Sequence, residues 1–120
     1  MNPINLGLRF LLEMACLIGI GWASWSLSTS PRRWVLVVAV PFTAAAVWGV
    51  FAVPNDPSRS GGAPVPVPGL LRLVVEFVVL GSGVAGFVLV GQPAIATVLA
   101  ILLIVHYALS YKRIVWLLKR

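Results

Sequence analysis

The sequence contains very few of the residues that carry most protein chemistry. Among 120 residues there are one cysteine, one histidine and three acidic residues. A single cysteine forms no internal disulfide and supplies no cysteine pair for a structural zinc site. Neither a Ser-His-Asp arrangement nor an H-E-x-x-H motif is legible in the chain. We therefore expect the protein not to be an enzyme, and to bind neither a metal nor a cofactor.

Charged residues are also scarce, and this scarcity indicates that the protein lies in a membrane and not in water. Charged residues make up 10% of the chain and hydrophobic residues 60%, with a mean hydropathy of +1.02. A soluble domain needs more polar surface than this composition provides. The apolar runs are about 20 residues long, which matches roughly 30 Å of hydrocarbon at about 1.5 Å per residue. The sequence predicts an all-α bundle of four transmembrane helices, at about 6–27, 34–53, 70–91 and 94–111.

The connections between these runs predict one membrane domain over residues 1–120. A Pro- and Gly-rich loop covers 54–69, and the turn "VGQPA" is short enough to make the last two helices an antiparallel hairpin. Glu13 interrupts the first run, so we expect a retained helix there and not a cleaved signal peptide. The basic tail at 112–120 has two interpretations: an interfacial extension of the last helix, or an unstructured end that only enforces orientation.

The net charge of +6 comes from nine Lys and Arg residues at the ends of the apolar runs. That placement is typical of membrane topology and not of nucleic-acid binding. Four spans would put seven of these cations on the side of both termini and two, Arg32 and Arg33, on the other. The excess predicts a multi-pass protein of the inner (cytoplasmic) membrane with cytoplasmic termini, whose tail lies near anionic lipid headgroups. The seven are Arg9, Arg59, Arg72, Lys112, Arg113, Lys119 and Arg120.

A short internal repeat is the most informative pattern in the chain. "LRFLLE" at 8–13 recurs as "LRLVVE" at 71–76, which suggests two related hairpins with a pseudo-twofold axis along the membrane normal. A spacing of four places Arg9 and Glu13 on one face of the first helix. The same spacing places Arg72 and Glu76 on one face of the third.

The fourth predicted helix brings His106 and Tyr107 to nearly the level of both glutamates. Ionisable groups at membrane depth usually face the bundle interior and mark functional sites. The layer could therefore form a small-solute or proton-linked binding or transport module. The alternative is a structural or accessory membrane subunit whose Arg–Glu pairs only hold the helices together.

Small residues suggest where the helices approach one another. "GSGVAG" at 81–86 fits a dinucleotide-binding pattern, but no acidic residue follows Glu76, so that interpretation lacks its context. Close helix packing in lipid is the better explanation. The expected packing positions are Gly19, Gly81, Gly83 and Gly86. Such faces also permit a homo-oligomer or a partner membrane protein, in addition to the lipid bilayer itself.

Three segments, "NLGLRFLLEM", "WGVFAVPNDP" and "LLRLVVEF", together resemble the YrdB-like family of small bacterial membrane proteins. The resemblance covers nearly the whole chain and implies a four-helix membrane protein of uncharacterised function. Small multidrug transporters are a weaker comparison, based on their length and on a glutamate in their first helix. Their loops carry little charge bias, and they lack the second Arg–Glu pair.

Overall fold

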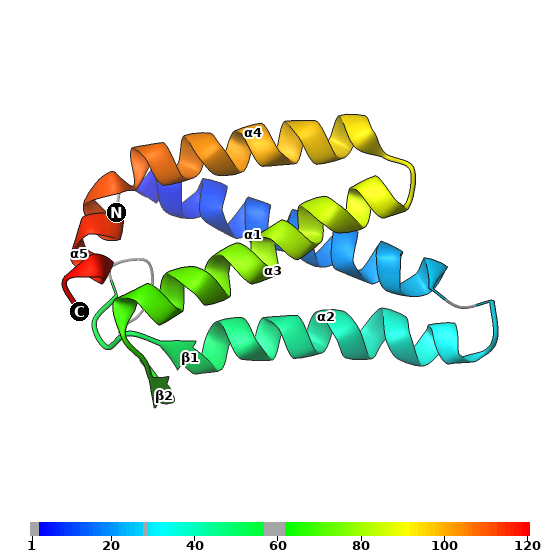
Figure 1. The fold of residues 1–120 in the computed structure, drawn as a ribbon, viewed down its shortest axis with the longest axis horizontal. Coiled ribbons are helices and arrows are strands. Elements are labelled where there is room, and N and C mark those ends of the chain that lie inside the picture. Colours follow the sequence, from blue (N-terminus) through cyan, green and yellow to red (C-terminus); the bar gives the residue numbers. More distant parts are fainter. Residues whose placement is uncertain (1–2, 28, 57–61) are drawn as a thin grey trace.

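The computed structural model describes residues 3–27, 29–56 and 62–120 and is almost entirely helical (Figure 1). The five helices are α1 (Pro3–Ser26), α2 (Arg32–Val50), α3 (Gly69–Leu89), α4 (Pro93–Leu109) and α5 (Tyr111–Leu118). The all-α class is therefore confirmed. The sequence did not predict the short parallel pair of strands β1 (Phe51–Ala52) and β2 (Val65–Pro66), which closes the long loop.

Three helices, α1, α2 and α3, are each long and apolar enough to cross a membrane. Helices α4 and α5 pass the same test only as a pair, because the chain bends by 69° between them. The tail thus does not continue the fourth helix in a straight line. It forms a separate helix across the end of the molecule at which α1 begins (Figure 1).

The buried residues of three chain segments follow the alternating three- and four-residue spacing of a coiled-coil seam. In α4 and α5 this seam continues through the bend, and it combines apolar residues with polar ones. The seam positions are 5, 9, 12, 16 and 19 in α1, then 69, 72, 76, 79, 83 and 86 in α3, and 96, 99, 103, 106, 110, 113 and 117 in α4 and α5. The polar residues of these seams lie at one end of the bundle.

Helices α1 and α3 approach most closely at glycines. A Cβ atom on Gly83 would lie 2.5 Å from the Cα atom of Cys16, and one on Gly19 would lie 2.5 Å from the carbonyl oxygen of Gly83. Gly86 faces the backbone of Gly19 equally closely. Small residues permit such backbone contact in membrane helices. Gly81, by contrast, is exposed and has open space around its Cα atom, so it makes no such contact within this chain.

Helix α2 packs at the edge of the molecule. None of its residues is buried, and Trp34, Val35 and Phe42 are among the large apolar side chains it exposes. Helix α2 contacts α1 at Gly21, where an added Cβ atom would lie 3.4 Å from the Cγ atom of Pro41. The core therefore consists of α1, α3 and α4, with α2 alongside.

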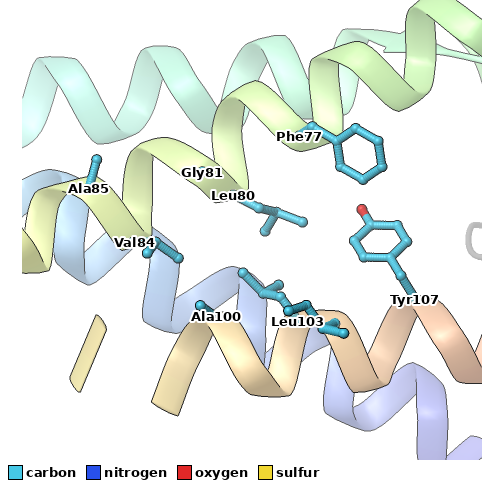
Figure 2. A pocket seen from close by; sticks show the side chains of 9 residues that line it. Phe77, Leu80, Gly81, Val84, Ala85, Ala100, Leu103 and Tyr107 are labelled. Carbon is cyan, nitrogen blue, oxygen red and sulfur yellow. The ribbon is translucent and has the colours of Figure 1, made fainter. Parts of the chain in front are cut away.

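Shallow apolar grooves run between the helices on the outer surface. One of about 560 Å³ lies between α3 and α4, and Figure 2 shows its lining, from Ala85 and Ala100 to Phe77 and Tyr107. The rings of Phe77 and Tyr107 meet edge to face with their centroids 5.2 Å apart. A second groove, of about 500 Å³, lies between α1 and α4 and is equally apolar. These surfaces suit hydrocarbon better than water.

Candidate functional site

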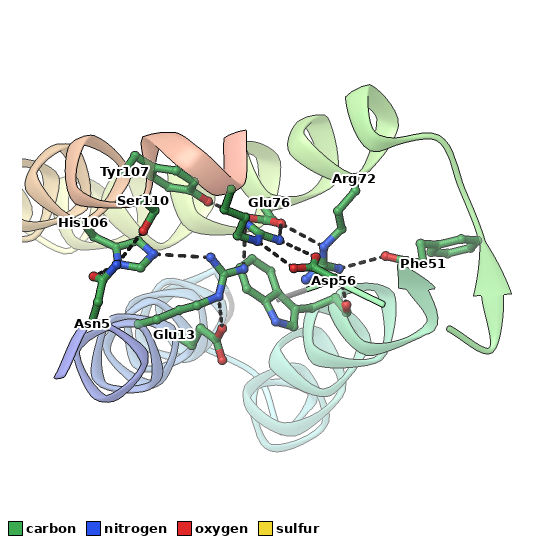
Figure 3. Close-up of polar contacts among 12 residues, drawn as sticks. Asn5, Glu13, Phe51, Asp56, Arg72, Glu76, His106, Tyr107 and Ser110 are labelled. Carbon is green, nitrogen blue, oxygen red and sulfur yellow. Dashed lines mark hydrogen bonds and ion pairs between the residues drawn. The ribbon is translucent and has the colours of Figure 1, made fainter. Parts of the chain in front are cut away.

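Glu76 is the centre of a buried ionic cluster (Figure 3). Its Oε1 atom accepts a hydrogen bond of 2.7 Å from the Tyr107 hydroxyl, and its Oε2 atom accepts one of 2.9 Å from Arg72 Nε. Arg113 donates to both oxygens, at 2.9 and 2.6 Å. Arg9 Nη2 completes the shell as an ion pair 3.0 Å from Oε1. Four side chains from α1, α3, α4 and α5 thus converge on one carboxylate.

Arg113 also binds Asp56, which follows β1. Its Nε atom donates to Oδ1 at 2.8 Å and its Nη2 atom to Oδ2 at 2.6 Å. Burial alone would lower the pKa of Arg113, but the hydrogen bonds to Asp56 and Glu76 outweigh it, and the pKa is raised. The sequence placed Arg113 with the tail cations near the headgroups. The structure corrects this assignment, since Arg113 and Asp56 are buried against each other.

Arg72 attaches α2 to α3. Its Nη1 atom donates to the carbonyl oxygens of Trp48 and Phe51, the latter at 2.8 Å. The last carbonyls of a helix have no partner within the helix and carry its negative end. The Trp48 ring also lies 4.9 Å from the Arg9 guanidinium carbon and 4.7 Å from that of Arg72. Such distances are those of cation–π contacts.

A chain of hydrogen bonds leads from Arg9 to α4. Arg9 Nη1 lies 3.4 Å from His106 Nε2, and His106 Nδ1 lies 2.8 Å from Asn5 Oδ1. Asn5 Nδ2 in turn donates to Ser110 Oγ at 2.7 Å. A guanidinium only donates and an amide oxygen only accepts, so His106 is neutral here, with its proton on Nδ1.

Glu13 differs from Glu76 although the two occupy matching places in the repeat. Its ion pair is with Arg9, at 3.2 Å, and its side chain is 23% exposed whereas that of Glu76 is fully buried. The cause lies in the spacing, because Glu13 is one residue beyond the seam position of Leu12. Glu13 instead lines a cavity of about 90 Å³ beside Trp48. The contacts therefore do not repeat the symmetry that the sequence suggests.

The charges in the cluster balance. Three arginines, Arg9, Arg72 and Arg113, face three carboxylates, Glu13, Glu76 and Asp56. Within the described residues, no three His, Cys, Asp or Glu side chains are grouped as a metal site would require. The arrangement suits mutual neutralisation of buried charges.

The structure brings together all six residues that the sequence proposed: Arg9, Glu13, Arg72, Glu76, His106 and Tyr107. Five further members were not assigned to this site: Asn5, Trp48, Asp56, Ser110 and Arg113. A signal for two of these existed in the sequence, because Ser110 and Arg113 continue the spacing of His106 by four and seven residues. Asp56 gave no such signal, since its position depends on the fold of the loop.

Comparison with known proteins identifies the family. A family model described as "Protein of unknown function (DUF2568)" matches residues 7–104. "Uncharacterized protein YrdB" of Bacillus subtilis (strain 168) is 40% identical over 120 residues, which cover 100% of this chain and 98% of the relative. The chain belongs to this family. The resemblance seen in the sequence is thereby confirmed, and no solved structure matches the chain.

Membership in the DUF2568 family brings no activity with it, because neither the family nor its Bacillus relative has an assigned function. The arguments about function therefore rest on the geometry of the cluster. That geometry separates a saturated carboxylate, Glu76, from a partly open one, Glu13.

Proposed function

We propose that the protein is an accessory or structural subunit of the bacterial cytoplasmic membrane, and that its ionic cluster is a clamp that holds the helices in place. The observation that supports this best is the saturation of Glu76. Each of its oxygens has at least two partners, and all of them are side chains of this protein. A ligand would have to displace one of these charge-assisted hydrogen bonds, which are the strong ones in proteins.

The clamp reaches every helix. Glu76 lies on α3 and contacts α1, α4 and α5 through Arg9, Tyr107 and Arg113, while Arg72 extends the network to the end of α2. Removing one member leaves a buried charge without its counterion, which typically costs about 3–5 kcal/mol. The helices expose many large apolar side chains, which suits contact with lipid or with another membrane protein.

The proposed topology has four spans, the last formed by α4, with α5 following it at the cytoplasmic end and both termini in the cytoplasm. Three of the cations counted for orientation, Arg9, Arg72 and Arg113, are neutralised inside the cluster and lie out of reach of headgroups. Lys112, Lys119 and Arg120 remain exposed at this end. Arg59 lies outside the described residues. At the opposite end Arg32 is exposed and Arg33 is half-buried over the Trp25 ring. The end with the two termini therefore still has more exposed cations than the opposite end.

Site-directed labelling tests this topology. Single cysteines at Gly62, in the long loop, and at Thr29, between α1 and α2, occupy exposed positions on opposite sides. A membrane-impermeant maleimide added to intact cells should label Thr29→Cys and leave Gly62→Cys unmodified until the cells are opened. Labelling of both variants from outside would refute the orientation.

A second function is favoured by the position of Glu13. The side chain has one ion pair, partial exposure and a neighbouring cavity of about 90 Å³, which is room for a few water molecules. Protonation of Glu13 would leave the pair between Arg9 and Glu76 in place. Glu13 is thus the one member of the repeated pairs that could exchange a proton without dismantling the clamp.

Proteoliposomes distinguish the two functions. The clamp alone predicts that the wild type and Glu13→Gln show the same proton leak, measured with a pH-sensitive dye inside the vesicles. A proton-linked function predicts a flux that Glu13→Gln abolishes while the variant stays folded. Infrared spectroscopy of the same two proteins identifies the group that takes up the proton. A carboxyl band that titrates in the wild type and disappears in Glu13→Gln would assign the proton to the Glu13 side chain.

A further inference from the structure

Helix α5 has two faces of different character. Its inner face contains Arg113 and Leu117, both buried, and a Cβ atom on Gly69 would collide with the Leu117 carbonyl. This contact and the bonds of Arg113 to Asp56 and Glu76 fix α5 across the end of α3. The helix is therefore held in a defined orientation, with one side turned permanently outward.

The outward side combines an apolar ridge with cations. At about 100° per residue, Tyr111, Val115 and Leu118 fall on the face opposite Arg113, and all three are exposed. Three exposed cations accompany this ridge: Lys112, Lys119 and Arg120. The segment 111–120 contains no acidic residue, and Arg120 lies over the ring of Trp116 at 4.5 Å.

We propose that α5 is a membrane-surface helix that binds anionic lipid. The bend of 69° turns its axis well away from that of α4, so a spanning α4 would place α5 near the plane of the interface. There Lys112 and Lys119, which fall roughly 100–120° around the helix from Arg113, can reach lipid phosphates at the side of the bundle. Charge complementarity selects anionic lipids over zwitterionic ones, because each basic residue near such a surface gains its own attraction. The proposal rests on the membrane placement proposed above and goes beyond it by naming the lipid class.

The inner and outer faces of α5 are coupled through the same short helix. Lipid bound at Lys112 and Lys119 would hold α5 against the bundle, and Arg113 would thereby stay on Asp56 and Glu76. A ligand that binds only the docked helix stabilises the docked state. Anionic lipid should therefore slow the local opening of α5.

Hydrogen exchange of the full-length protein in lipid nanodiscs tests this. The probes are discs of phosphatidylcholine and discs with one part phosphatidylglycerol to three parts phosphatidylcholine. Amides of 111–118 should exchange more slowly in the anionic discs, by roughly fivefold for each engaged cation. The difference should shrink at high salt. It should be lost in Lys112→Gln/Lys119→Gln/Arg120→Gln and retained in Arg32→Gln, which removes an exposed charge at the other end.

Equal exchange of 111–118 in the two kinds of disc would overturn the proposal, and so would a lipid effect that survives the triple substitution. An effect on 111–118 that requires an added acidic protein in place of anionic lipid would also overturn it. Failure of the membrane placement is a separate result. In that case the protein would be released from cell membranes by carbonate at high pH, whereas a spanning protein remains in the pellet whatever α5 binds.

Discussion

Replacing Glu76 by glutamine tests the clamp most directly. The substitution keeps the size of the side chain but removes the charge that faces Arg9, Arg72 and Arg113. Because Glu76 is fully buried, the lost counterion is not replaced by water. Breaking a buried ionic network in this way costs about 3–5 kcal/mol. Glu76→Gln should therefore lower the free energy of unfolding by that amount.

Glu13→Gln is the matched control, since it makes the same chemical change one repeat away. The Glu13 side chain is 23% exposed and has an ion pair with Arg9, which keeps a second pair with Glu76. Ion pairs of this partly exposed kind contribute about 1 kcal/mol or less. The two glutamine variants should thus differ by at least about 2 kcal/mol.

The assay is reversible unfolding in a mild detergent titrated with dodecyl sulfate, followed by far-ultraviolet circular dichroism and by tryptophan fluorescence. A double-mutant cycle with Arg72→Gln isolates the pair, because Arg72 and Glu76 are bonded at 2.9 Å. The double variant should lose less stability than the two single variants together, by about 0.5–3 kcal/mol. Equal losses for Glu76→Gln and Glu13→Gln, combined with an additive cycle, would refute the clamp.

Three further predictions concern packing and hydrogen-bond geometry. Gly83→Ala should destabilise the protein by about 1–3 kcal/mol in the same titration, because its Cβ atom would meet Cys16 at 2.5 Å, whereas Gly81→Ala, with open space, should be neutral or stabilising. Arg113→Lys keeps the charge but cannot form two forked contacts, so it should lose about 2 kcal/mol or more while Lys112→Arg changes little. The Cys16 thiol is fully buried and should react with maleimide only as fast as the bundle opens, so labelling of the native protein at the rate of a free thiol would contradict this packing.

The sequence was sufficient to predict the helices and the level of the polar layer. Helical spacing and apolar run length depend on local residues, so the ends of α1, α3 and α4 fall within a few residues of the predicted limits. His106 and Tyr107 reached the level of Glu76 because an antiparallel hairpin fixes the depth of each position.

The bend before α5 was not predicted, because the chain there has neither proline nor glycine to mark it. Ser110 is where α4 ends and the turn into α5 begins. Its N–H donates to the carbonyl oxygen of His106, and its own carbonyl oxygen accepts a hydrogen bond from the N–H of Arg113. The Arg113 side chain is therefore buried, although the side chains of Lys112 and Lys119 in the same tail are exposed. Charge counting treats these cations alike, and only the seam spacing distinguishes them.

The same limitation explains why the repeated Arg–Glu turns were expected to act alike. The six-residue repeat preserves the i to i+4 pairing within each helix but says nothing about which residue lies on the seam. In α3 both the arginine and the glutamate occupy seam positions, whereas in α1 only the arginine does, because Leu12 is next in the seam and Glu13 lies beside it. Arg9 therefore points at Glu76, and Arg72 turns to the end of α2. The two motifs are nearly identical, but they differ by one residue in their alignment with the seam. As a result Glu76 is fully buried among its partners, whereas Glu13 lines a cavity. Any chemistry beyond structural support should consequently be sought at Glu13.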